Sequence, residues 1–159
     1  MSTRKPKAIP MQADDIAAEV RRLSDIEAIK QLKAKYTRLV DAKDWEAWGQ
    51  LFTEDGHLHT DGGPIEGRDN VVAGISKALA EAVTVHRLHP PEITLTGPDT
   101  ASAIWPMTDY VTGTFGGRAL IIRGYGHYHE DYLRTPDGWR FKRSRLIRQR
   151  VETTPGAPS

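Results

Sequence analysis

The sequence predicts an α+β fold in which helices come first and an antiparallel sheet follows. Three observations lead to this class. Apolar residues recur at three- and four-residue steps early in the chain, β-rich alternating segments begin at residue 92, and Gly, Pro and Asp punctuate those later segments. In such a chain we expect the helices to pack on one face of a curved sheet.

The first helical pattern begins near Ile16 and ends near Val40. Ser24 and Glu27 have the spacing of a capping box, so we expect a short helix and then a fresh helix start at Ser24. A second helix should begin at Asp44, whose carboxylate can cap the first turn. It would carry Trp45, Trp48, Leu51 and Phe52 on one side.

A third helix should follow Gly67, with Asp69 as its cap and an apolar stripe that includes Ile75 and Leu79. The polar sequence near His86 is then expected to be rich in turns. Strands are predicted over residues 56–60, 92–96, 100–112, 119–132 and 139–151. The sequences at 97–99, 113–117 and 135–138 are typical of hairpin turns.

The length of 159 residues suits a single domain, which we expect to span residues 14–152. The ends at 1–13 and 153–159 are polar, basic or rich in Pro, Gly, Thr and Ser, so we expect flexible tails there. The 22 Lys and Arg residues nearly balance the 21 Asp and Glu residues, giving a net charge of +1. This balance favours neither nucleic acid nor a membrane as a partner, so a small molecule is the expected ligand.

Cysteine is absent, which excludes disulfides and thiolate chemistry and fits a reducing cytoplasm. The sequence has no apolar segment of membrane-spanning length. We therefore expect a cytoplasmic protein.

Tyr36 and Asp41 close the first helical pattern, and His86 lies beyond it. A histidine exchanges protons near neutral pH, and a carboxylate bonded to its second nitrogen fixes the tautomer. These residue types together point to proton-transfer chemistry. Taken singly, Asp41 is better explained as a turn residue and His86 as a surface or structural histidine, and Tyr36 is equally well explained as a core tyrosine.

Two histidine pairs suggest a competing metal site, because His57 with His59 and His127 with His129 each share one strand face. No third cluster completes such a site in the sequence, and no glycine-rich phosphate loop or dinucleotide motif is present. We expect neither a metal nor another cofactor.

Longer stretches carry a family resemblance: DIEAIKQLKAKY at 25–36, VDAKDW at 40–45, GRD at 67–69, TVHRLHPPEI at 84–93, GYGHYH at 124–129 and DGW at 137–139. The chain resembles the nuclear transport factor 2-like superfamily. Within it, the chain is most similar to the SnoaL-like branch, which includes scytalone dehydratase, hexachlorocyclohexane dehydrochlorinase and bile acid 7α-dehydratase. The resemblance implies a cone-shaped, cystatin-like fold whose helices close over a strongly curved antiparallel sheet around an apolar pocket.

The resemblance also implies a set of catalytic residues. His86 would act as the base, Asp41 would orient it, and Tyr36 would donate a hydrogen bond to a substrate oxygen. Arg148 would anchor a polar substituent, although the last strand carries several arginines and which of them enters the pocket stays open. We expect the apolar lining to come from Trp45, Trp48, Phe52, Trp105, Met107, Tyr110 and Tyr125.

The resemblance, taken together with these residues, implies a cofactor-independent lyase that eliminates water or another leaving group from a small hydrophobic cyclic substrate, steroid- or polyketide-like. A ketosteroid-type isomerase needs the same base and is the nearest alternative. A non-catalytic protein of the same fold, which binds a hydrophobic ligand or completes an assembly, is a third. The family resemblance further implies a homo-oligomer, either a dimer or a trimer.

Overall fold

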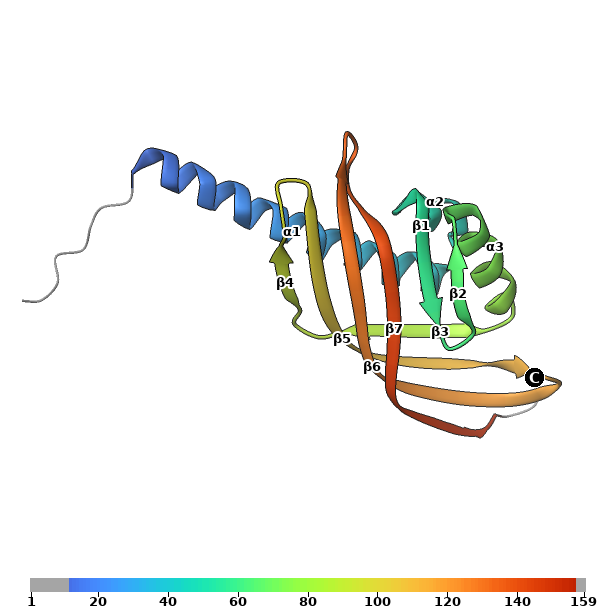
Figure 1. Cartoon of the computed structure of the whole chain (residues 1–159). Helices are drawn as coiled ribbons and strands as arrows, with labels where there is room; N and C mark the ends of the chain where they lie inside the picture. The colour runs from blue at the N-terminus through green and yellow to red at the C-terminus, as the bar shows by residue number, and fades with distance from the viewer. Residues whose placement is uncertain (1–11, 157–159) are drawn as a thin grey trace, which may run out of the picture.

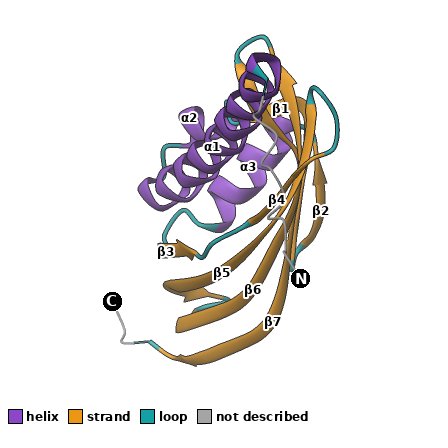
Figure 2. Cartoon of the chain, turned by 90° about the vertical axis from the view of Figure 1, so that its left-hand side faces the viewer, coloured by secondary structure: helices purple, strands orange, loops and turns teal. Residues whose placement is uncertain are grey.

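The computed structural model describes residues 12–156, which form three helices on one side of a curved seven-stranded sheet (Figures 1 and 2). The helices are α1 (Ala13–Ala42), α2 (Trp45–Gly49) and α3 (Arg68–Ala78). The strands are β1 (Phe52–Thr60), β2 (Gly63–Glu66), β3 (Val83–Leu88), β4 (Glu92–Leu95), β5 (Thr100–Phe115), β6 (Arg118–Thr135) and β7 (Gly138–Pro155). The predicted α+β class is confirmed.

Helix α1 is continuous, which corrects the expected break at Ser24. The helix continues because the apolar spacing is unbroken through this region, and no residue that ends a helix interrupts it. Its N-terminal half projects beyond the sheet (Figure 1), leaving Ile16, Val20 and Leu23 half exposed. Its C-terminal half is buried along one face, which brings Tyr36 into the core.

Helices α2 and α3 begin close to where the sequence predicts. The Asp44 side chain accepts a hydrogen bond from the Ala47 backbone N–H at 3.2 Å, so the predicted cap is confirmed. Helix α2 is short, and Phe52 already belongs to β1. In α3 the N-cap is Gly67 itself, with φ of 83°, while Asp69 lies in the first turn.

The sheet has the order β2-β1-β7-β6-β5-β3, with β4 also paired to β5. All pairs are antiparallel except β1 with β7, so the sheet is mixed, which corrects the antiparallel expectation. The sequence did not predict the two short strands β2 and β3. Strand β3 lies where a turn-rich stretch was expected around His86, which corrects that expectation. Because β3 pairs with β5 from Val83 to Leu88, the His86 side chain has a defined face.

Register shifts in the β6–β7 ladder at Tyr125/Gly126 and at Asp131/Tyr132 accompany the strong bend of these long strands (Figure 2). Strand β7 continues through Thr153 and Thr154, which pair with β6, to Pro155. The domain therefore extends past the predicted boundary at 152. The predicted N-terminal tail lies outside the described residues up to residue 11, and α1 starts at Ala13.

The core lies between the helices and the concave face of the sheet. Tyr36 packs at centroid distances of 5.3 Å from Trp48 and 5.2 Å from Phe141, within a cluster of tilted and edge-to-face aromatic pairs. A buried ion pair between Lys33 and Glu130 also lies in this core. Sequence reasoning did not foresee it, since a lysine on an amphipathic helix normally faces solvent.

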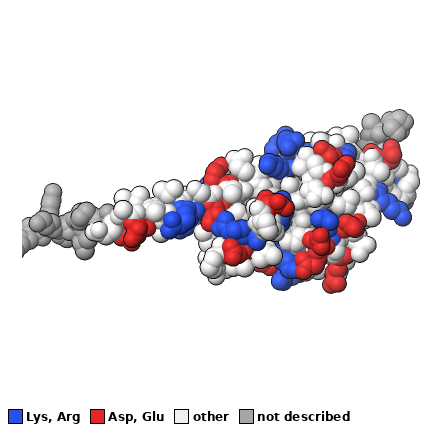
Figure 3. All heavy atoms as spheres, turned by 90° about the horizontal axis from the view of Figure 1, so that it is seen from above, with Lys and Arg blue, Asp and Glu red and all other residues white. Residues whose placement is uncertain are grey.

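Acidic and basic side chains are interspersed over the face shown in Figure 3. Among residues 12–156, no helix combines the length and apolarity needed to cross a membrane.

Candidate active site

A cavity of about 180 Å³ lies between the helices and the concave face of the sheet. Helix α1, helix α3 and strands β1, β3, β5, β6 and β7 all contribute to its wall. The wall is mainly aliphatic, with a few polar groups. It consists of Tyr36, Val40, Leu58, Thr60, Ile75, Ala78, Leu79, Thr84, His86, Val111, Tyr128, Leu146 and Arg148.

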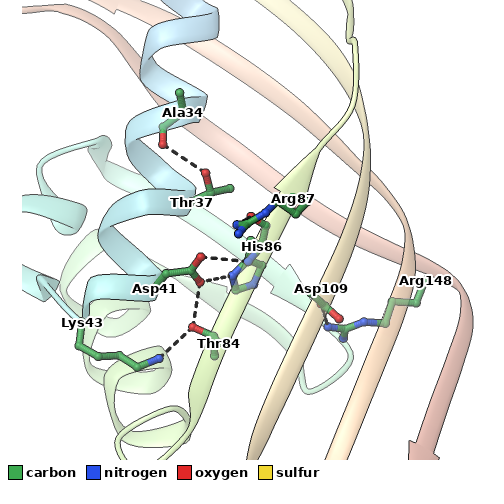
Figure 4. A network of polar contacts seen from close by, with 9 residues as sticks. All are labelled: Ala34, Thr37, Asp41, Lys43, Thr84, His86, Arg87, Asp109 and Arg148. Carbon is green, nitrogen blue, oxygen red and sulfur yellow. Dashed lines mark hydrogen bonds and ion pairs between the residues drawn. The ribbon is translucent and has the colours of Figure 1, made fainter.

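Asp41 and His86 meet beside this cavity (Figure 4). Asp41 Oδ1 lies 2.6 Å from His86 Nδ1, and Asp41 Oδ2 accepts the His86 backbone N–H at 2.9 Å. Thr84 Oγ1 donates to Asp41 Oδ1 at 2.9 Å and accepts from Lys43 Nζ at 3.0 Å. The predicted proximity of the acid and the imidazole is therefore present.

The end of α1 sets this geometry. Lys43 follows the last helical residue in the left-handed region, with φ of 61°, and its N–H bonds back to the helix. Asp41 thus occupies the final turn, directly opposite β3. A carboxylate there meets the negative end of the helix dipole, which is unfavourable. The hydrogen bonds from Thr84 and His86 compensate for this.

These bonds also decide the protonation state. Burial raises the pKa of Asp41, but the hydrogen bonds from His86 and Thr84 outweigh it and hold the pKa below its usual value. An ionised carboxylate only accepts hydrogen bonds, so His86 Nδ1 carries the proton that lies between them. The Nε2 lone pair is then free to accept a proton, and the Asp41 charge would stabilise the resulting imidazolium.

Arg148 also reaches the cavity wall, but its guanidinium is already engaged. One Nη bonds to Asp109 and the other to Asp61. Burial alone would lower the pKa of Arg148, but the two carboxylates raise it. Asp109 is completely buried, whereas the Asp61 side chain is 59% exposed. The Asp61 contact is consequently the one that an incoming anion can displace most easily.

Gly124 makes room for this bridge. A Cβ atom at position 124 would lie 2.6 Å from Arg148 Nε and would collide with the Asp109 carboxylate. Asp109 lies directly opposite His86 in the β3–β5 ladder, so the two side chains share the concave face. Arg148 is therefore the C-terminal arginine that the fold brings to the cavity.

Two tyrosines also contribute to the polar part of the wall. The Tyr36 and Tyr128 rings pack edge to face at 6.0 Å, and both line the cavity. Burial, with neighbouring negative groups such as Glu130, raises the pKa of both phenols well above their usual value. Both therefore stay protonated at neutral pH and can donate hydrogen bonds.

None of the seven predicted lining residues faces this cavity, which corrects that prediction. Trp48, Phe52, Trp105 and Met107 are buried in the core, and Trp45 packs against it. Large apolar side chains fill the space between sheet and helices most efficiently, so they form the core, and smaller aliphatic residues are left around the opening.

Tyr110 and Tyr125 lie on the opposite, outer face of the sheet. Tyr110 alternates with Asp109 and Val111, whose side chains are buried on the inner face. Its ring instead packs against Arg123, 5.5 Å from the guanidinium, and Tyr125 is 37% exposed. The sequence shows that side chains alternate between the two faces of each strand, but it does not show which set of residues faces the core.

The histidine pairs also point away from the cavity. His57 and His59 alternate with Leu58 and Thr60, which line it, and His127 and His129 flank Tyr128 in the same way. Within residues 12–156, no three His, Asp or Glu side chains are grouped so as to hold a metal ion.

Sequence reasoning missed Thr84, Asp109 and Tyr128. Thr84 is two residues from His86, and a strand at this position would have placed both on one face. Asp109 and Tyr128 became identifiable only through the ladder register. Ile75 and Leu79 were found as an apolar stripe, but their place in the cavity wall depends on how α3 packs.

Comparison with known proteins gives the family. A model of the SnoaL-like domain matches residues 21–145, most of the chain. The chain belongs to the SnoaL-like family. This SnoaL-like chain is 26% identical over 133 residues to a "probable cyclase" of Gibberella zeae, covering 76% of this chain and 88% of that protein.

Solved structures agree on the fold. An NTF2-like protein with a cystatin-like fold from Novosphingobium aromaticivorans is 30% identical, has a TM-score of 0.67, and covers 87% of this SnoaL-like chain and 90% of its own. A type 2 hexachlorocyclohexane dehydrochlorinase matches with a TM-score of 0.77 at 17% identity, over 87% of this chain and 94% of its own. The expected NTF2-like, SnoaL-like fold is confirmed.

Proposed function

We propose that this protein is a cofactor-independent lyase that eliminates water, or another leaving group, from a small hydrophobic cyclic substrate. The observation that carries the proposal is the Asp41–His86 pair, with 2.6 Å between Oδ1 and Nδ1, at the wall of an apolar cavity. A relative named a probable cyclase and a structural neighbour named a dehydrochlorinase favour chemistry of this general type.

In this proposal, His86 Nε2 removes a proton from a substrate carbon, and the C–H electron pair becomes the new double bond. The leaving hydroxyl takes a proton from the imidazolium and departs as water, which restores neutral His86. The Asp41 carboxylate stabilises the imidazolium between these steps. Tyr36 and Tyr128 donate hydrogen bonds to the substrate oxygen on which negative charge develops.

In this scheme Arg148 binds an acidic group of the substrate only when one of its present partners is displaced. Its Nη groups are bound to Asp61 and Asp109, so a substrate carboxylate reaches the guanidinium by displacing the exposed Asp61. The charge of the inner Asp109 would remain paired throughout.

Cavity size narrows the substrate class. Sites for drug-sized ligands measure about 300–1,000 Å³, and this cavity measures about 180 Å³. We therefore propose that one or two rings of the substrate enter the cavity, and that any larger steroid- or polyketide-like skeleton extends out of it.

The test is a panel of hydroxylated cyclic ketones and steroids, monitored by mass for the loss of one water. His86→Ala and Asp41→Asn should abolish or strongly reduce turnover while the melting temperature shows a folded protein. His89→Ala is the matched control, since His89 follows β3 directly and does not line the cavity. Turnover that survives in folded His86→Ala would refute the proposal, and a product of unchanged mass would indicate isomerisation.

A further inference from the structure

Lys33 lies in the core beneath the two tyrosines of the cavity wall. Its Nζ is 3.4 Å from the centroid of the Tyr128 ring and 4.2 Å from that of Tyr36. The side chain is completely shielded from solvent. A cation over an aromatic face is attracted by the ring quadrupole, and the attraction is strongest where water is excluded.

Glu130 holds Lys33 in this position. Glu130 Oε1 lies 2.6 Å from Lys33 Nζ and accepts the Ser144 hydroxyl at 2.8 Å. Tyr132 donates to the other carboxylate oxygen and accepts from Trp105 Nε1 at 2.9 Å. A carboxylate with three donors is arranged to carry negative charge, which calls for a cationic partner.

Stability alone does not account for this pair. Two charges removed from water contribute little net stability compared with apolar residues of similar volume. The pair has a defined direction relative to the cavity, however, with the positive group nearer to it. The ammonium contacts the rings of both cavity tyrosines, while the carboxylate is bonded to Ser144 and Tyr132, neither of which lines the cavity.

We propose that Lys33 is a positioning residue that strengthens the Tyr36 and Tyr128 hydroxyls as hydrogen-bond donors. The ammonium draws electron density towards the buried faces of the rings, which polarises the O–H bonds at the cavity. This effect opposes that of burial and of Glu130, which raise the pKa of both phenols. The cavity then selects ligands whose oxygen carries negative charge, of the phenolate or enolate class. This inference rests on the proposed function, because the same hydroxyls would face the substrate oxygen.

The experiment uses two probes of similar shape and different acidity, 4-nitrophenol and 4-methylphenol, with the full-length protein. Titration calorimetry gives the ratio of their affinities. Lys33→Met/Glu130→Gln removes both charges and nearly keeps the volume, which avoids leaving one buried charge unpaired. We expect the preference for 4-nitrophenol to fall about threefold or more in this neutral pair.

Tyr132→Phe is the matched control, because it removes one hydrogen bond to Glu130 and leaves Lys33 charged; its affinity ratio should match that of the wild type. If Lys33→Met/Glu130→Gln does not fold, Lys33→Gln/Glu130→Gln offers two amides that can bond to each other. A folded neutral pair with the wild-type ratio would overturn the Lys33 inference.

A third variant, Tyr36→Phe/Tyr128→Phe, separates this inference from the proposed function. Loss of the preference in that variant shows that the hydroxyls make the selection, whatever Lys33 does. The Lys33 inference and the proposed role of the tyrosines would both be overturned if the wild type showed no preference for 4-nitrophenol. They would also be overturned if the preference persisted in Tyr36→Phe/Tyr128→Phe.

Discussion

Asp41 shows how one residue can be placed against its local preference. The C-terminal turn of a helix disfavours a carboxylate by about 0.3 to 1 kcal/mol, yet three donors from β3 bond to this one. The contact between Asp41 Oδ1 and His86 Nδ1 also fixes the His86 tautomer. The unfavourable position of the Asp41 carboxylate at the end of α1 is therefore linked to the tautomer that lets His86 act as a base.

The pH dependence of stability tests this arrangement. The folded-state pKa of Asp41 lies below its unfolded value of about 3.9. Its stabilising contribution is therefore present above about pH 4 and is lost as the pH falls through the folded-state pKa. We expect the melting-temperature difference between the wild type and Asp41→Asn to shrink as the pH falls from about 5 to about 2.5.

Glu54→Gln provides the control for this measurement, since Glu54 is exposed on β1, away from any helix end. Its melting curve should follow that of the wild type at every pH. A difference between wild type and Asp41→Asn that stays constant across the range would contradict the assigned hydrogen bonds.

At the scale of elements, Arg148 links strands that are not neighbours. It extends from β7 across β6 to Asp109 on β5, over the space left by Gly124, and also reaches Asp61 in the β1–β2 turn. This bridge stands beside the cavity, so it holds part of the cavity wall in place.

Breaking the bridge on one side should be costly. Arg148→Met leaves the buried Asp109 carboxylate unpaired and should lower the free energy of unfolding by about 3–5 kcal/mol. Arg148→Met/Asp109→Asn should recover most of that loss, because no buried charge then remains. Urea denaturation measures both.

The exposed pair of Arg143 and Asp131 serves for comparison. Arg143→Met should change the free energy of unfolding by at most about 1 kcal/mol. If Arg148→Met and Arg148→Met/Asp109→Asn lost the same free energy of unfolding, the unpaired Asp109 charge would not be the cause of the loss.

At the scale of the whole molecule, much of the fold follows from the sequence. Apolar periodicity predicts α1 and α3, and Gly-Pro-Asp and Pro-Asp-Gly segments predict the hairpins of the bent sheet. Strand β3 escaped prediction because its six residues include His86 and Arg87, and its identity depends on pairing with β5. Long-range pairing is not visible in local pattern.

The candidate site was likewise predictable only in part. Asp41, His86, Tyr36 and Arg148 were identified from the family resemblance, and the structure brings them to one region. The lining was predicted wrongly because large aromatic residues serve the core equally well, and sequence pattern does not separate these uses. The homo-oligomer and the cytoplasmic location remain predictions.

Proton exchange at carbon tests the central claim, that His86 supported by Asp41 is a base in an apolar cavity. A small cyclic ketone is incubated with the protein in deuterated water, and deuterium uptake next to the carbonyl is followed by NMR. We predict uptake faster than in buffer, reduced about 10²- to 10⁴-fold in folded His86→Ala and unchanged in His89→Ala. Equal uptake by wild type and folded His86→Ala would contradict the account.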